Sequence, residues 1–283
     1  MRWQGRRKSS NVEDRRGLSG RGLTVGGGLG AVVALVIYLF FGGNSDKIPQ
    51  GINPLQKSET STERTLTAQE KELGDFAAVI LADTEDVWNS IFSKGGREYR
   101  EPGMVLFSGS TESACGFAQS ATGPFYCPGD GKVYIDLDFF QELQQRLNAP
   151  GDFAMAYVIA HEVGHHVQNL LGIMDQRDRM RERLDEREFN QYTVKLELQA
   201  DFLAGVWAHH AQRMKNMLEE GDIEEAINAT GAVGDDRIQK RTQGYIVPDS
   251  FTHGTSRQRT RWFLKGWETG DINQGDTFNT EDL

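Results

Sequence analysis

The clearest apolar pattern in the chain is a helical one that begins after residue 66. Thr67 and Glu70 have the spacing of a capping box, in which each side chain bonds the backbone N–H of the other at a helix start. Apolar residues then recur three or four positions apart until Gly95 and Gly96 end the run: Leu73, Phe76, Ala77, Ile80, Leu81, Val87, Trp88 and Ile91. The pattern predicts a helix that packs one face into the core.

The pattern changes between residues 104 and 138, where short apolar runs alternate with Gly, Ser and Pro. Four of these runs are typical of strands of a small sheet: 105–107, 116–118, 125–127 and 133–135. The last run comes shortly before the next predicted helix. We expect residues 133–136 to form an edge strand that could pair with an extended peptide, although an ordinary sheet strand fits the same residues.

Two long helices are predicted in the second half of the chain. The first runs from Phe153 to about Leu171, with Asp152 as its N-cap and Gly172 as its stop. The second holds residues 191–218, in which several apolar residues share one side: Val194, Leu198, Phe202, Val206 and Trp207. The stretch between them, residues 175–188, is dense in Arg, Asp and Glu and predicts a solvated loop or surface helix.

Charge is distributed unevenly along the 283 residues, whose formal net charge is −10. Residues 1–21 carry seven Arg and Lys against two acids, so the remaining chain carries 24 basic residues against 39 acidic ones. A nucleic-acid-binding protein would need a clustered basic face on its body. The acidic body therefore argues against a nucleic-acid partner.

An uncharged segment, residues 23–43, follows the basic head and is just long enough to span a bilayer, which needs roughly 20 helical residues. We expect a basic cytoplasmic N-terminus over residues 1–22, a transmembrane anchor over 23–43, a polar linker over 44–66 and the main domain over 67–283. The positive-inside rule then predicts a single-pass protein of the bacterial inner membrane, with the main domain in the periplasm or outside the cell.

A cleaved signal peptide is the alternative for this segment, because its wholly apolar centre spans only residues 29–41. The residues that follow offer no clear small-x-small cleavage site, and the basic region is unusually long. Both features favour a retained anchor.

Cys115 and Cys127 are the only cysteines. On the far side of a membrane such a pair favours a disulfide over a metal site, and two thiolates without a nearby CxxC or His make a poor zinc cage. Two buried free thiols are the alternative, since spacing alone does not establish disulfide geometry.

An HExxH sequence lies within the first of the two long helices. His161 and His165 are four residues apart, so they share one helix face and can bind a single zinc ion. Glu162 leaves the backbone at the next position, from which it can reach a zinc-bound water without being a ligand. Two ordinary core histidines are the alternative, but they would be buried with no partner to offset desolvation.

Zinc needs a third protein ligand, with its fourth position left to water. The metzincin extension is excluded, because Gln168 and Leu171 stand where that pattern requires Gly and His. Glu197 and Asp201 lie one turn apart on the second long helix. We expect Glu197 to complete a His/His/Glu site and Asp201 to hydrogen-bond the outer nitrogen of His161. Asp201 as the ligand, or Glu197 as a solvent-facing residue, are the alternatives.

The expected chemistry is hydrolysis, in which zinc activates a water molecule and Glu162 serves as the general base. The oxyanion that forms usually requires a second donor besides the metal. His253, in a polar turn-like stretch, is our candidate for that donor, and a surface histidine is its alternative. Tyr126 and Tyr134 are lesser candidates.

The chain also resembles a known family. HExxH with a downstream ExxAD helix resembles the gluzincin metallopeptidases, and several stretches look like the bacterial family described as "putative neutral zinc metallopeptidases": MRWQGRRKSSNVEDRRG, FYCPGDGKVYID, HEVGHHVQ, ELQADFLAGVWA and FTHGTSRQR. The resemblance implies one zinc ion, a hydrolytic role and an anchored extracytoplasmic domain. We therefore expect an α+β fold: a zincin-like, mainly helical metallopeptidase domain with a small β-sheet, preceded by one transmembrane helix.

Three functions share this predicted site. The favoured one is a zinc metallopeptidase acting on a protein or peptide substrate. A zinc-stabilised binding or assembly factor of the cell envelope, without catalysis, is the alternative from another class. A zinc hydrolase acting on cell-wall peptide or another amide would differ only in its substrate pocket.

Overall fold

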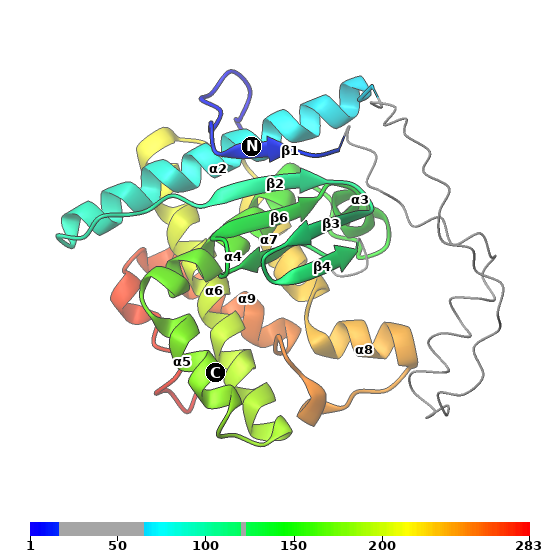
Figure 1. Cartoon of the computed structure of the whole chain (residues 1–283), viewed down its shortest axis with the longest axis vertical. Coiled ribbons are helices and arrows are strands. Elements are labelled where there is room, and N and C mark those ends of the chain that lie inside the picture. Colours follow the sequence, from blue (N-terminus) through cyan, green and yellow to red (C-terminus); the bar gives the residue numbers. More distant parts are fainter. Residues whose placement is uncertain (17–64, 120–122) are drawn as a thin grey trace, which may run out of the picture. The chain divides into compact units, whose positions relative to one another are not determined.

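The computed structural model describes residues 1–16, 65–119 and 123–283, and Figure 1 labels its elements. The larger sheet has four strands in the order β1-β2-β6-β5. Their bounds are Val12–Asp14 for β1, Gly103–Phe107 for β2, Lys132–Asp136 for β6 and Phe125–Cys127 for β5. Strands β1, β2 and β6 run parallel, and β5 runs antiparallel to β6.

Strand β6 lies inside this sheet, because it pairs with β2 on one side and with β5 on the other. The register places Val133 opposite Met104 and Tyr134 opposite Phe125. The prediction that residues 133–136 form an edge strand is therefore wrong, since β6 pairs with β2 along its length and with β5 over residues 132–134. The edge beside it belongs to β5.

A disulfide joins a short hairpin to the end of β5. The hairpin consists of β3 (Ser110–Ser113) and β4 (Gly116–Gln119), paired antiparallel. Cys115 lies in its turn and is bonded to Cys127. The predicted disulfide is thus confirmed, and it holds the hairpin against the edge strand of the larger sheet.

Helices make up the rest of the domain. The predicted capping box of Thr67 and Glu70 starts α2 (Ala68–Lys94). The second long helix, α6 (Glu186–Lys215), starts earlier than expected because Asp185 and Glu188 form a further capping box. Part of the charged stretch before it forms α5 (Ile173–Arg181). The remaining helices are α3 (Asp138–Gln145), α4 (Asp152–Leu170), α7 (Asp222–Ala232), α8 (Asp235–Gln243), α9 (Ser256–Thr269) and the short 3-10 turns η2 (Pro248–Ser250) and η3 (Ile272–Gln274).

Helix α4 is the centre of the domain. It packs against β5, β6, α2, α6 and α7, and every residue from Phe153 to Gln168 is buried. Small residues let its neighbours come close: a Cβ on Gly164 would lie 3.0 Å from the backbone oxygen of Ala200 on α6. Polar side chains on α4 are therefore held in fixed positions beside α6.

Helix α9 crosses α6 at two glycines. A Cβ on Gly205 would lie 2.1 Å from the backbone oxygen of Phe263, and one on Gly266 would lie 2.0 Å from that of Phe202. Any side chain at either position would force the helices apart. The two glycines thus fix how closely α9 approaches the residues that α6 carries.

The basic N-terminal residues belong to the same compact unit as the main domain: Met1–Arg16 and Leu66–Leu283 form this unit. Strand β1, which lies in the N-terminal part of this unit, pairs with β2 (Figure 1). Arg6 contacts the buried carboxylate of Asp83 at 3.0 Å, and Arg7 contacts that of Glu85 at 2.9 Å. Their positive charges therefore neutralise acids on α2.

These observations correct the predicted membrane topology. Two parts of one compact unit lie on the same side of any membrane, so a cytoplasmic N-terminus with the body across the inner membrane is wrong. In the three described ranges, no helix is both long and apolar enough to cross a membrane. The predicted anchor, residues 23–43, lies outside the described residues. For the described residues, the fold class is accordingly corrected to a mixed, mainly helical domain with a small sheet, among whose helices none is a transmembrane helix.

Candidate metal centre

Two histidines of α4 and one glutamate of α6 meet in a single cluster. The Nε2 atom of His161 lies 3.2 Å from one carboxylate oxygen of Glu197, and the Nε2 atom of His165 lies 3.4 Å from the other. One ligand atom from each of the three residues falls within 4.8 Å of the others. The structure thus brings together the three residues that the sequence predicts as metal ligands.

The other ring nitrogen of each histidine is held by a neighbouring acceptor. His161 Nδ1 lies 2.9 Å from Asp201 Oδ1, and His165 Nδ1 lies 2.8 Å from Gln168 Oε1. Since both acceptors are oxygens, the neutral rings carry their proton on Nδ1. Each Nε2 lone pair is then directed at the shared cluster, as metal binding requires.

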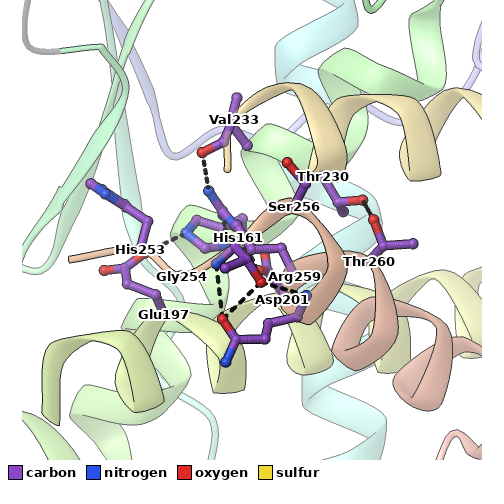
Figure 2. Close-up of polar contacts among 12 residues, drawn as sticks. His161, Glu197, Asp201, Thr230, Val233, His253, Gly254, Ser256, Arg259 and Thr260 are labelled. Atoms are coloured by element: carbon purple, nitrogen blue, oxygen red, sulfur yellow. Dashed lines mark hydrogen bonds and ion pairs between the residues drawn. The ribbon is translucent and has the colours of Figure 1, made fainter. Parts of the chain in front are cut away.

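Arg259 of α9 holds Asp201 in place (Figure 2). Its Nε and Nη2 atoms donate to the two oxygens of Asp201 at 2.8 and 3.0 Å. Tyr157 donates its hydroxyl to the same carboxylate, and Arg259 also donates to the backbone oxygen of Val233. Arg259 and Asp201 are both buried, so this bidentate pair is shielded from water.

The electrostatics of the cluster favour a cation between the three ligand atoms. Burial lowers the pKa of His161, but Asp201 and Glu197 outweigh burial and raise it to about 10. Burial raises the pKa of Glu197, but the two imidazoles hold it well below its ordinary value. Burial likewise raises the pKa of Asp201, yet Arg259 and His161 bring it down to about 2. A site that attracts a proton this strongly has the negative potential that a divalent cation needs.

The donor set fits zinc. Two imidazole nitrogens and one carboxylate are the protein ligands of many catalytic zinc sites, which keep one position open. A second acidic group in the described ranges is different in kind: Asp152, Asp222 and Glu225 offer only carboxylate oxygens. Asp152 contacts the Met1 amine at 2.9 Å, and Glu225 accepts from the backbone N–H of Phe153 at 3.0 Å.

A cavity of about 490 Å³ opens onto the cluster. His161, Glu162, His165 and Glu197 all contribute to its wall. Its volume lies within the range of about 300–1,000 Å³ that is common for ligand pockets. Glu162, the predicted general base, therefore lines the same space as the three candidate ligands.

His253 lines this cavity from the segment before α9, and Asp235 orients it. Asp235 accepts from the backbone N–H groups of Thr252, His253 and Gly254 at 2.6 to 3.1 Å, while its other oxygen lies 3.2 Å from His253 Nδ1. Burial lowers the pKa of His253, but Asp235 and Glu197 outweigh it and raise the pKa. His253 therefore lines the cavity and stays protonated to higher pH than an ordinary histidine.

The two tyrosines are placed differently. The backbone oxygen of Arg100 accepts from His166 Nε2 at 2.6 Å, so His166 Nδ1 accepts the hydroxyl proton of Tyr126 at 3.0 Å. Tyr126 lines the cavity, but its proton is directed away from it. Tyr134 donates to Asp130 at 2.7 Å and is not among the residues that line the cavity.

Sequence reasoning missed Arg259, Gln168 and Asp235. Arg259 and Asp235 contact side chains 58 and 18 positions away in the chain, so no local pattern marks them. Gln168 lies one helical turn after His165, and that spacing was the signal that could have found it. Arg259 does stand in the stretch FTHGTSRQR, which carries part of the family resemblance.

Comparisons with known proteins agree with this geometry. The model of the family described as "Putative neutral zinc metallopeptidase" matches residues 1–278. "Uncharacterized protein YpfJ" of Escherichia coli K12 is 48% identical over 285 residues, covering 98% of this chain and 99% of that protein. "Uncharacterized protein Rv2575" of Mycobacterium tuberculosis H37Rv is 46% identical over 195 residues, or 65% of each chain. No solved structure matches.

The family match includes the N-terminal residues that fold onto α2 as well as the helices that carry the metal cluster. The chain belongs to the family described as "putative neutral zinc metallopeptidases".

Proposed function

We propose that the protein is a zinc-dependent peptidase in which His161, His165 and Glu197 hold one zinc ion. The observation that carries this proposal is that two Nε2 atoms and a carboxylate face one another in a cavity that Glu162 also lines. Zinc bound there would supply a Lewis acid that makes water a stronger acid and polarises the substrate carbonyl.

Glu162 moves the proton in this reaction. It accepts a proton from the attacking water and then gives it to the nitrogen of the leaving amine. Its position supports this role, because it follows His161 in α4 and lines the cavity without belonging to the three-residue cluster.

His253 stabilises the developing oxyanion. Asp235 fixes its backbone and its Nδ1 atom, which leaves Nε2 to donate to a negative oxygen. A raised pKa keeps the ring protonated to higher pH, as a donor to an anion requires. Tyr126 is a poorer candidate, because it donates its proton to His166.

Strand β5 offers a place for the substrate backbone. It is the edge strand beside β6, and Phe125 and Tyr126 on it line the cavity. An extended peptide could add to this edge by main-chain hydrogen bonds, which bind a peptide regardless of its sequence.

Glu162→Gln tests the proposal. The purified variant should keep one zinc ion per chain and lose cleavage of an unstructured protein such as reduced, denatured casein. Glu220→Gln is the matched control, because Glu220 is an exposed glutamate outside the cavity. Full activity of Glu162→Gln would refute the assigned role, whereas zinc binding by an inactive wild-type protein would favour a zinc-stabilised factor without catalysis.

A further inference from the structure

One part of the cavity wall is apolar and comes from separate segments of the fold. We name it the apolar pocket, and it consists of Phe139, Leu147, Val158, Val233 and Ile238. Phe139 lies on α3, Leu147 follows α3, Val158 lies on α4, Val233 follows α7 and Ile238 lies on α8. None of these five side chains carries a polar group.

One hydrogen bond joins two walls of the apolar pocket. Arg241, one turn after Ile238 on α8, donates to the backbone oxygen of Arg146, which is next to Leu147. The C-terminal end of helix α3 is therefore held beside α8. These side chains face a common space, because all five line the one cavity.

The apolar pocket adjoins the metal cluster. Val158 precedes His161 by one turn of α4, so both lie on the same face of that helix. Val233 accepts a hydrogen bond from Arg259 at 3.2 Å, and Figure 2 shows Val233, Arg259 and His161 close together. A substrate residue next to the reacting bond would therefore reach the apolar pocket.

Beyond His165, the cavity has a more polar lining. Arg177 of α5 and Thr193 of α6 contribute to it there, together with Met174 and Leu196. Helix α5 follows the C-terminal end of α4, and Gln168 near that end donates to the backbone oxygen of Leu196 on α6. These residues therefore lie past His165, while Val158 lies before His161. The lining past His165 thus includes polar side chains, whereas the five side chains of the apolar pocket include none.

We propose that the apolar pocket binds a large apolar or aromatic side chain of the substrate, at one fixed position beside the cleaved bond. The substrates would then be unfolded or extended polypeptides, since such side chains are usually buried in folded proteins. A charged side chain would lose its hydration in the pocket without gaining a partner. This inference rests on the proposed peptidase function.

The test is a cleavage profile of the full chain on a library of peptides from digested, denatured bacterial proteins, read by mass spectrometry. At one position beside the cleaved bond, Phe, Leu, Met and Tyr should be favoured over Ala by about tenfold or more. Asp and Glu should be disfavoured there.

Two variants alter the pocket from different segments. Ile238→Asp should abolish the apolar preference and favour Lys and Arg at that position, and Leu147→Ala should shift the preference toward larger aromatic residues. Both side chains are only partly buried, so the variants should fold and keep their zinc. Ile246→Asp is the matched control, because Ile246 is 45% exposed and lies outside the cavity; its profile should equal that of the wild type.

Cleavage by the wild type without an apolar preference would overturn the inference and leave the proposed peptidase function standing. So would an unchanged profile in both pocket variants. Absence of any cleavage by the zinc-loaded wild type would instead refute the proposed function, and the inference with it.

Discussion

Replacing Arg259 by methionine removes the guanidinium from Asp201 and leaves an apolar side chain in the same buried position. Asp201 is fully buried, and it would lose two charged hydrogen bonds of 2.8 and 3.0 Å. Breaking a buried ion pair by removing one partner costs about 3–5 kcal/mol, because the remaining charge is left without compensation. Tyr157 and His161 still contact Asp201, so we expect the lower end of this range.

Zinc binding should weaken in the same variant. Asp201 fixes the ring of His161, and loss of such a partner typically lowers metal affinity by 10–100-fold. Urea unfolding in the presence of a chelator would measure the free energy of unfolding, and competition with a chromogenic chelator would measure the zinc affinity.

Arg261→Met is the matched control for Arg259→Met. Arg261 lies on the same helix, but its partner Asp282 is exposed, so its loss should change stability little and zinc affinity not at all. The reasoning would be refuted if Arg259→Met unfolded at the same urea concentration as Arg261→Met and bound zinc equally well.

Two further predictions concern packing and pH. Gly266→Ala should destabilise the domain by about 1–3 kcal/mol or more, because its Cβ would meet the Phe202 backbone oxygen at 2.0 Å. Gly231→Ala is the control and should not destabilise the domain, because the nearest neighbour of its Cβ would be a side-chain tip at 3.4 Å. Thermal unfolding would compare the two variants. Burial lowers the pKa of His166 from 6.5 to about 4. As the pH falls, His166 therefore binds a proton at higher pH in the unfolded chain than in the folded one. Stability should therefore decline between about pH 6.5 and 4, by about 3 kcal/mol. Urea titrations across this range should show a smaller decline in His166→Phe, and an equal decline in both proteins would contradict the prediction.

Local patterns predicted the elements that carry the metal cluster. The HExxH spacing put His161 and His165 on one helix face, and the one-turn spacing of Glu197 and Asp201 put both on another. The structure brings these four residues together, because α4 and α6 pack closely at Gly164. Their chemical roles stay predictions.

Partners that depend on the tertiary fold were not predictable in this way. Arg259 reaches Asp201 across 58 positions of the chain, and Asp235 reaches His253 across 18. Strand order likewise decides which strand is an edge, and β5 takes the place that the sequence suggested for β6.

The N-terminal residues show how one pattern can fit two structures. A basic head before an apolar run is typical of a membrane topology signal. Here Arg6 and Arg7 pair with the buried acids Asp83 and Glu85, which only the folded chain brings near them. The basic character of this segment therefore has a structural reason within the domain.

The position of bound zinc tests the central claim most directly. Anomalous diffraction at the zinc edge, from crystals grown with one equivalent of zinc, should give one strong peak about 2.0–2.2 Å from the Nε2 atoms of His161 and His165 and from a Glu197 oxygen. A peak at Asp152, Asp222 and Glu225 instead, or none near the two imidazoles, would contradict the account.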